Sequence, residues 1–466
     1  MPNLLIKNGI ILTVDRSRRV IWDGAIFVEN GRISDVGKTE DVKTKHTAEI
    51  EIDARNKLIS PGLINTHTHL FGSFARGLVE NLEFMPWCEK KLRLTHLVLD
   101  KENYYISSLF LAMEMIKTGT TCLVDCGTVP GLEESAATAV RDVGVRAVLG
   151  RNVADVYNPP LTTFPVYLRK STDQQVSEVE SFVKKWNNQA GGRISAWVCP
   201  IQTPCVSDNL WREAFRIANT YDVGVLTHAG VDPQDVNETV KNFGSRAMER
   251  LYNLGVLGPR LLAAHMGHVS DKEVSYLEEK GGNVSHCPAA SMHLAYGASQ
   301  GRIPEMMDVG INVGLGSDGP AAGNFQDMVR VMHLAATCHK EARRNCSIVQ
   351  PETVVEMATI NNAKAIQREH EIGSIEIGKK ADLVIFNTNM PQWRPLNKLN
   401  VVRNLVYSSS GDSAETVIID GSIVMEKGKL LTVNEQEVLE KTQKYSEKML
   451  QVDLKEFPEE PVWPQI

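Results

Sequence analysis

Eight short apolar segments follow one another along this chain, and a longer stretch with helical periodicity separates each from the next. The segments span residues 58–67, 120–125, 146–152, 194–201, 224–228, 261–265, 283–286 and 312–318. A strand followed by a helix, repeated eight times, is the pattern of a (β/α)₈ barrel. We therefore predict an α/β fold with a TIM barrel over residues 58–370.

Both ends of the chain carry a different pattern, with short strands and glycine-containing turns. Residues 1–57 include the turn Glu29-Asn30-Gly31, and strand-and-turn sequence returns in 373–387, 401–408 and 415–431. We expect segments 1–57 and 371–432 to pair into one small composite β-sandwich domain beside the barrel. Residues 433–466 are expected to form a C-terminal helix and tail.

Composition narrows the class of protein. The 466 residues include 50 Lys+Arg and 57 Asp+Glu, a net charge of −7, which argues against a nucleic-acid surface built on positive charge. No apolar stretch reaches the length of a membrane span, and the start of the chain lacks the pattern of a signal peptide. The eight cysteines show no CxxC spacing. We expect a cytoplasmic protein with reduced thiols.

Polar residues gather where the predicted strands end. His67 and His69 close the first strand, His228 the fifth, His265 the sixth and Asp318 the eighth. The carboxyl ends of barrel strands face one mouth, and residues two apart on extended backbone point the same way. Imidazoles with one carboxylate suit Zn²⁺, and Fe²⁺ or Mn²⁺ remains open. Histidines 46, 96, 333, 339 and 370 are expected to be structural.

Seven motifs follow one another along nearly the whole chain. They are 61–69 (PGLINTHTH), 76–78 (RGL), 119–121 (GTT), 255–260 (GVLGPR) before Ala264-His265, Cys287-Pro288, 314–319 (GLGSDG) and 373–384 (GSIEIGKKADLV). In this order they resemble the amidohydrolase superfamily, in its branch of metal-dependent deaminases and triazine hydrolases.

The resemblance implies a distorted barrel, a flanking β-sandwich and one divalent metal held by His67, His69, His228 and Asp318. It also implies that His265 polarises the group under attack and that Asp318 moves protons. Relatives with two metals use a lysine or glutamate at the end of the fourth strand, where this chain has neither. We expect a single metal, most simply Zn²⁺, with Cys199 at that strand end as an alternative ligand.

Two positions depart from the family pattern. Deaminases of this branch carry a proton-donating glutamate three residues after the fifth-strand histidine, where this chain has Val231. Three interpretations stay open: Asp232 substitutes, His265 and Asp318 carry the protons alone, or deamination is lost. The fourth strand offers Gln202 where nucleoside deaminases have a histidine, which argues against an adenosine-like substrate.

Pocket residues are predicted from their place after the strands. Phe84, Met85 and Trp87 follow the first strand, where a flat heteroaromatic ring would stack. Gln202 offers both a donor and an acceptor to the ring edge. Four residues after or at the end of the seventh strand are further candidates: His286, Ser291, Met292 and His293.

We predict a mononuclear metal-dependent hydrolase that removes ammonia from an N-heterocyclic or amidine-like small molecule. The alternatives are displacement of halide or alkylamine from a triazine-like ring, and a metal-holding protein without turnover. We expect a small-molecule substrate, no nucleic-acid or membrane partner, and a homo-oligomer, either a dimer or a tetramer.

Overall fold

A parallel sheet of eight strands forms the centre of the computed structural model, which describes residues 2–157, 169–457 and 463. The strands follow one another in chain order: β6 (Leu63–Thr68), β7 (Thr120–Thr128), β8 (Arg146–Val153), β9 (Ile194–Pro200), β10 (Val225–Ala229), β11 (Leu261–His265), β12 (Asn283–His286) and β13 (Asn312–Leu315). The two end strands approach each other, and the Asp318 amide donates to the His67 carbonyl at 2.9 Å. This confirms the predicted α/β barrel.

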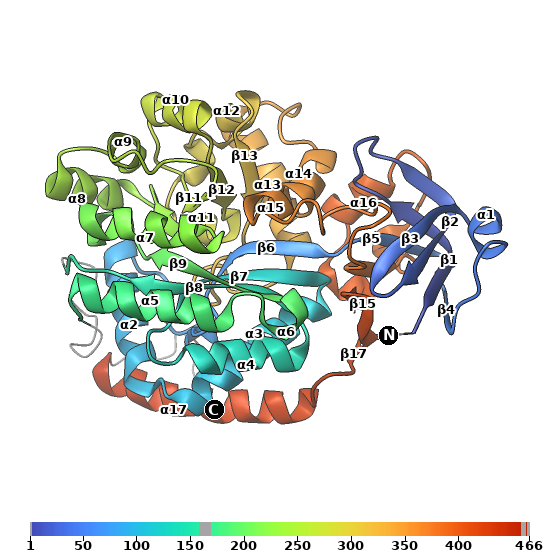
Figure 1. Ribbon diagram of the computed structural model, residues 1–466, viewed down its shortest axis with the longest axis horizontal. Helices are drawn as coiled ribbons and strands as arrows, with labels where there is room; N and C mark the ends of the chain where they lie inside the picture. Colours follow the sequence, from blue (N-terminus) through green and yellow to red (C-terminus); the bar gives the residue numbers. More distant parts are fainter. Residues whose placement is uncertain (1, 158–168, 458–462, 464–466) are drawn as a thin grey trace.

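Helices lie outside the barrel (Figure 1). They are α2 (Phe84–Val98), α3 (Lys101–Lys117), α4 (Glu133–Val143), α5 (Thr172–Trp186), α6 (Gln189–Gly192), α7 (Asp208–Tyr221), α8 (Pro233–Phe243), α9 (Ala247–Asn253), α10 (Asp271–Lys280), α11 (Pro288–His293), α12 (Ile303–Asp308), α13 (Met328–Arg343), α14 (Pro351–Met357) and α15 (Ile360–Ala365). Several have strong local start signals. A side chain caps the first turn of α3 (Asp100), α5 (Ser171) and α10 (Ser270), each in a capping box.

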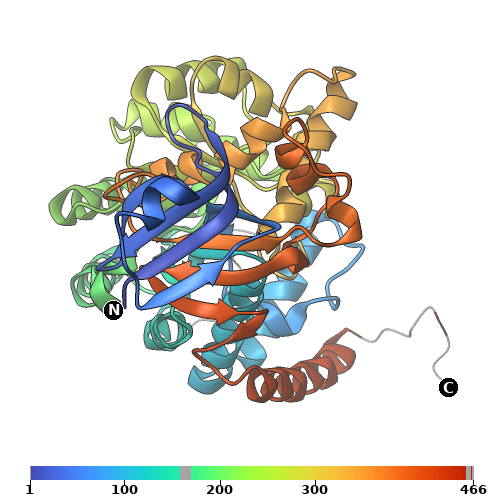
Figure 2. The ribbon, with the colours of Figure 1, turned by 90° about the vertical axis from the view of Figure 1, so that its right-hand side faces the viewer.

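The second sheet joins the two ends of the chain. Its strands are β1 (Leu4–Leu12), β2 (Val20–Glu29), β3 (Arg32–Lys38), β4 (Ile50–Asp53), β5 (Lys57–Pro61), β14 (Leu383–Asn387), β15 (Ala414–Ile419), β16 (Ser422–Glu426) and β17 (Lys429–Leu430). N-terminal β5 pairs antiparallel with C-terminal β14 along its whole length. Figure 2 faces this sheet and shows the blue and red strands side by side. Short helix α1 (Thr39–Lys43) follows β3.

Two segments differ from the sequence prediction. The sequence predicts one barrel strand over residues 58–67, but they divide between β5 in the composite sheet and β6 in the barrel. Gly62 stands between them, where a Cβ atom would lie 2.0 Å from the Thr121 hydroxyl. The sequence also predicts a strand over residues 401–408, yet Val401–Tyr407 forms helix α16. Its buried residues Val401 and Leu405 are four apart, which is the spacing of one helix face.

A buried ion pair connects the barrel to the composite sheet. The Arg146 guanidinium at the start of β8 donates to both oxygens of Asp382, at 2.8 and 3.0 Å. The Asp420 amide also donates to Asp382. A bidentate arginine pair of this kind is geometrically specific, so it fixes how the two sheets meet.

The C-terminal helix α17 (Glu435–Glu456) runs along the barrel and packs on α2 and α3, as Figure 1 shows in red. Its Met449 is buried in a cluster with Phe74 and Trp87. Most of the predicted tail lies outside the described residues.

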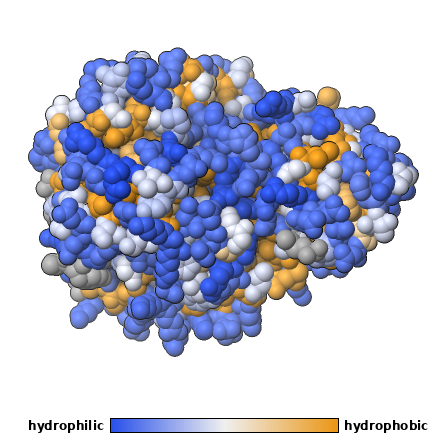
Figure 3. Space-filling view, viewed as in Figure 1, coloured by the Kyte–Doolittle hydropathy of each residue, from blue (hydrophilic) through white to orange (hydrophobic). Residues whose placement is uncertain are grey.

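The face of the molecule seen in Figure 1 carries hydrophobic residues in small groups among hydrophilic ones (Figure 3). Within the described part of the chain, no helix combines the length and the apolar character that a membrane span requires.

Candidate active site

Five polar side chains from four barrel strands converge at one mouth of the barrel. His67 Nε2 lies 3.5 Å and His69 Nε2 3.4 Å from the same oxygen of Asp318. His228 Nε2 lies 3.3 Å from His69 Nε2, and His265 Nε2 lies 3.8 Å from the other oxygen of Asp318. The structure therefore brings together all five residues that the sequence placed at strand ends.

Close approach of β13 to β6 makes this convergence possible. A Cβ atom on Gly316 would lie 2.5 Å from the His67 Cβ, so only glycine fits there. Asn65 and Ser317 exchange two hydrogen bonds, at 2.8 and 3.1 Å, directly below the site. Asp318 itself has φ of +62°, a backbone conformation that costs free energy and recurs at functional sites. The barrel closure thus holds Asp318 against the histidines.

The electrostatics suit a metal centre. Burial lowers the pKa of His69 to about 3 and that of His265 to about 4, and it holds the pKa of His228 well below its usual range. Burial alone would raise the pKa of Asp318, but the neighbouring imidazoles of His67 and His69 hold it well below the usual range. Neutral imidazoles beside an ionised carboxylate are the protonation states that metal binding requires.

Distances among the donor atoms fit a single small ion. Two ligand nitrogens at zinc-bond length in a tetrahedron are about 3.3 Å apart. The His69–His228 and His69–Asp318 separations of 3.3 and 3.4 Å match this value. His67 Nε2 is buried without a hydrogen-bond partner, and the ligand atoms of His67, His69 and His228 all lie within 4.8 Å of one another. The residues present therefore fit a metal ion.

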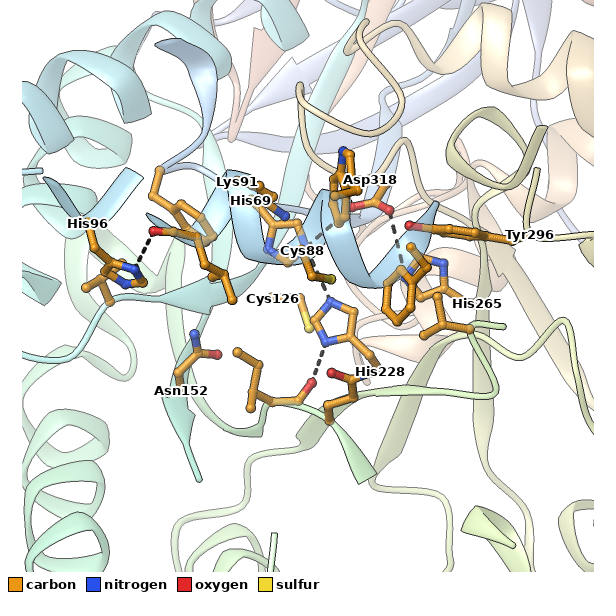
Figure 4. Close-up of a pocket in the computed structure, with 18 of the residues that line it drawn as sticks. His69, Cys88, Lys91, His96, Cys126, Asn152, His228, His265, Tyr296 and Asp318 are labelled. Atoms are coloured by element: carbon orange, nitrogen blue, oxygen red, sulfur yellow. Dashed lines mark hydrogen bonds and ion pairs between the residues drawn. The ribbon is translucent and has the colours of Figure 1, made fainter. Parts of the chain in front are cut away.

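A hydrogen bond through its other ring nitrogen orients His228, one of the prospective metal ligands. His228 Nδ1 donates to the backbone carbonyl of Ile201, which leaves Nε2 without its hydrogen and pointing at the cluster. Fixing the tautomer of a ligating histidine through its other nitrogen is a common feature of metal sites. Figure 4 shows this contact, with His228 below His69 and with Asp318 and His265 on one side.

A pocket opens beside the cluster. Phe84 and Trp87, both predicted to contact substrate, line it, but they stand on helix α2 rather than on a loop. The Trp87 indole donates to the Ala321 carbonyl at 2.9 Å, which fixes the plane of the ring. Met85 does not line this pocket among the residues described and packs in a neighbouring apolar cluster.

The end of β9 presents Gln202, as predicted, in a fixed orientation. Its amide nitrogen donates to Asp235 at 2.9 Å, and Asp235 also accepts from the Val231 amide at 3.2 Å. Val231 lines the pocket with an apolar side chain. Asp232 caps helix α8 by accepting from the Asp235 amide at 2.8 Å. The carboxyl of Asp232 is thus engaged in helix capping.

Five further predicted positions are not among the described residues that line the pocket. His286 is buried and its Nε2 is 3.1 Å from His339 Nε2. His293 contacts Glu80, and the Ser291 hydroxyl accepts from the Ala298 amide at 3.0 Å. Met292 is half exposed. Cys199 is buried against Cys126, with 3.6 Å between the sulfurs, outside the group that faces the cluster.

Sequence reasoning missed several residues that line the pocket, including Lys91, His96, Cys126, Asn152 and Tyr296. Lys91 and Trp87 are one helical turn apart, so a helical reading of residues 84–98 would have placed both on one face. His96, expected to be structural, also lines the pocket, on the side away from His265 (Figure 4).

Known proteins resemble this chain over nearly its whole length. The model of the amidohydrolase family matches residues 58–424. A 5'-deoxyadenosine deaminase of Methanosarcina mazei is 32% identical over 97% of this chain and 99% of its own length. A 5-methylthioadenosine/S-adenosylhomocysteine deaminase of Thermoanaerobacter pseudethanolicus is 31% identical over 96% of this chain and 100% of its own.

Among solved structures, an adenosine deaminase from Xanthomonas campestris with bound zinc superposes with a TM-score of 0.89. It is 25% identical and covers 96% of this chain and 98% of its own. The family match, the whole-length relatives and the histidine cluster together support a divalent metal. The chain belongs to the amidohydrolase family, as a hydrolase that acts on carbon–nitrogen bonds.

Proposed function

We propose that this enzyme hydrolytically removes the amino group from the ring of a purine-type heterocycle, with 5'-modified adenosines as the first class to test. The observation that carries the proposal is the convergence of four histidines and Asp318 beside a pocket whose lining includes Phe71, Phe84 and Trp87. The whole-length similarity to deaminases of 5'-deoxyadenosine and 5-methylthioadenosine supports the choice of substrate class.

Four residues are proposed to hold the metal: His67, His69, His228 and Asp318. Zn²⁺ is the proposed ion because nitrogen and oxygen ligands at tetrahedral spacing suit it, and because the adenosine deaminase of similar fold carries zinc. When bound, such an ion lowers the pKa of water towards about 7 and so supplies a nucleophile at neutral pH.

The chain's own residues position the reactants. Phe84 and Trp87 offer aromatic surface on which a planar ring stacks. The ionised Asp318 accepts the proton of the attacking water, since its carboxylate faces the cluster, and passes a proton on to the departing amine. His265, 3.8 Å from Asp318, is within reach of the same water and orients it.

Gln202 does not exclude a purine. Because its amide nitrogen is committed to Asp235, its carbonyl oxygen is the group left for a ligand, and it accepts a hydrogen bond from an N–H of the ring or of its amino group. Gln202 can therefore contact a purine although nucleoside deaminases have a histidine at this position of the fourth strand.

The test is ammonia release from a panel containing 5'-deoxyadenosine, 5'-methylthioadenosine, S-adenosylhomocysteine, guanine, cytosine and a chlorotriazine, with halide release followed in parallel. Enzyme reconstituted with Zn²⁺, Mn²⁺ or Fe²⁺ is compared with chelated enzyme. Ammonia from an adenosine derivative supports the proposal. Halide release without ammonia would replace it with triazine-type displacement, and silence across the panel would favour a metal-holding protein.

Location and assembly remain predictions. All eight cysteines are free in the structure, and reduced thiols are what a cytoplasmic protein has. We propose a cytoplasmic enzyme that binds a small molecule and no nucleic acid, and a homodimer or homotetramer, which light scattering after size-exclusion chromatography would identify.

A further inference from the structure

Lys91 is a buried cation whose ammonium group has no carboxylate partner among the described residues. The residue is 7% exposed, and its Nζ lies 4.4 Å from the centre of the Trp87 ring and 5.5 Å from that of Phe71. Within the described chain, these ring contacts are the interactions of its Nζ, with no hydrogen bond or ion pair. The adjacent Lys90, equally buried, pairs with Asp453 at 3.2 Å.

A buried ammonium that forms no ion pair costs folding free energy, and cation–π contacts recover only part of it. Buried charged groups of this kind cluster at functional sites, where a ligand can supply the partner. Lys91 lines the same pocket as His69, His265 and Asp318, and its charge is felt by His69 and Asp318. Figure 4 places it beside His69, away from Asn152. The missing partner is therefore on the reacting part of the substrate.

Hydrolytic deamination needs a donor at this place. The water oxygen bonds to the ring carbon that carries the amino group, and the π electrons of the adjacent C=N bond move onto the ring nitrogen. That nitrogen gains negative charge, and the barrier falls if a hydrogen-bond donor or cation contacts it. Where the family has a glutamate for this purpose, the structure has the apolar side chain of Val231.

Other groups around the pocket are less suited. The Asp232 carboxyl is occupied at the start of α8. Burial raises the pKa of the Cys88 thiol to about 12 and that of the Tyr296 phenol well above its usual range, so both remain neutral. Burial also lowers the pKa of Lys91, which makes its proton easier to share. Among the described residues that line the pocket, Lys91 is the only lysine or arginine.

We propose that Lys91 replaces the missing glutamate: its ammonium donates a hydrogen bond to the ring nitrogen beside the attacked carbon and stabilises the charge that develops there. This rests on the proposed deamination. The proton that the ring nitrogen takes up comes from the Lys91 hydrogen bond. As ammonia leaves, the hydroxyl on the attacked carbon becomes a carbonyl and gives up its proton, which restores the ammonium of Lys91, while the ring nitrogen keeps the proton that it gained.

The test compares wild type, Lys91→Met and Lys91→Met/Val231→Glu as metal-loaded enzymes, with 5'-deoxyadenosine as substrate. Methionine keeps the apolar stem over Trp87 but removes the donor. We expect kcat of Lys91→Met to fall by about 100-fold, with KM changed by less than about threefold, since the interaction strengthens in the transition state. The double variant is expected to regain about tenfold in kcat over Lys91→Met, because the carboxyl group introduced at position 231 restores a donor.

A binding readout separates this role from packing. Purine riboside keeps the ring nitrogen but lacks the amino group, so it binds without releasing ammonia. By calorimetry, its Kd is expected to weaken about tenfold in Lys91→Met and to change little in Lys185→Met, a surface lysine whose side chain is 57% exposed. If Lys91→Met does not fold, Lys91→Gln replaces it, because glutamine keeps a neutral hydrogen-bond donor. Its Kd for purine riboside is expected to lie between those of wild type and Lys91→Met.

Three outcomes would overturn the proposal. If wild type deaminates the substrate and Lys91→Met retains kcat within about threefold, Lys91 has no part in the chemistry although the proposed function stands. If kcat falls in Lys91→Met but the double variant gains nothing and purine riboside binds with unchanged Kd, the loss is structural. If wild type itself releases no ammonia from any ring, the proposed function fails and the role of Lys91 fails with it.

Discussion

Gln202 and Asp235 form a fixed pair at the pocket edge, with 2.9 Å between the Gln202 amide nitrogen and the Asp235 carboxylate. Asp235 is 3% exposed and also accepts from the Val231 amide, so its position is determined by backbone as well as side chain. A carboxylate accepts hydrogen bonds and cannot donate them, so it forces the amide group of Gln202 into one of its two orientations. The carbonyl oxygen takes no part in this pair, and we propose that it is the group that a ligand contacts.

Asp235→Asn should allow the Gln202 amide group to adopt the opposite orientation. The new amide group can donate to Gln202, which allows the Gln202 side chain to turn and present N–H to the pocket. We expect KM for a substrate that donates to Gln202 to rise by about tenfold with a smaller change in kcat. Steady-state kinetics on the best substrate of the panel measures this. Asn237→Asp, farther along the same helix, is the matched control, and equal KM in wild type and Asp235→Asn would contradict the prediction.

The Asp235 carboxyl group should also make the stability of the protein depend on pH, and Asp235→Asn should remove that dependence. Burial raises the pKa of Asp235 from 3.8 to about 6, although the Gln202 hydrogen bond opposes this. Between these values the folded state binds more protons than the unfolded state, so this residue's contribution to stability falls as pH rises from about 4 to 6. A pKa difference of about 2 corresponds to about 3 kcal/mol, which is an upper limit.

Asparagine does not titrate, so the stability of Asp235→Asn relative to wild type should increase between pH 4.5 and pH 7.5. Urea unfolding of both proteins at the two pH values measures the difference, and comparison within each pH cancels the titration of the other groups. A difference that is the same at both pH values would show that Asp235 titrates normally.

His67→Ala should remove the metal. His67 Nε2 is buried without a partner, so its loss deletes a ligand and leaves nothing to replace it. We expect the affinity for the metal to fall by more than about 100-fold. Loss of a residue that only hydrogen-bonds to a metal ligand already lowers metal affinity by about 10–100-fold. Metal content after dialysis measures this directly. His370→Ala, with a side chain 91% exposed, should keep the wild-type content; full occupancy in His67→Ala would refute the ligand assignment.

Asp318→Asn is expected to abolish ammonia release while the protein stays folded. The substitution preserves the shape of the side chain but removes the charge that faces the imidazoles. Loss of a general base costs about 10²–10⁴-fold in kcat. Single-turnover assays with metal content measured on the same sample separate loss of metal from loss of proton transfer. Activity within tenfold of wild type would exclude the proposed role.

Arg146→Met should destabilise the joint between the barrel and the composite sheet. It leaves the buried Asp382 carboxylate without its guanidinium partner, and breaking a buried pair in this way costs about 3–5 kcal/mol. Chemical denaturation measures the loss. Arg141→Met, at an exposed pair with Asp142, should change stability by less than about 0.5 kcal/mol. If both variants unfold alike, the interface does not depend on this pair.

Particular elements show how far sequence patterns reach. The alternation of strands and helices predicted the barrel, and polar residues at strand ends predicted the cluster, because a strand's carboxyl end is defined by chain direction alone. The pattern failed at 401–408, where β-branched valines suggested a strand although the spacing of buried residues is helical. It also failed to divide residues 58–67, since two consecutive strands in different sheets look like one apolar run.

What the sequence by itself determined is the barrel, its orientation and the identity of the residues at its mouth, because these follow from local periodicity and from the order of strands. Only the tertiary structure decided which groups meet across the pocket. Lys91 faces Trp87 without an acidic partner among the described residues, and Asp235 turns Gln202, because α2, β9 and α8 are brought together by packing of chain segments that lie far apart in sequence. Contacts of this kind leave no periodic signal in any one segment, which is why the polarity of the pocket emerged only from the folded chain.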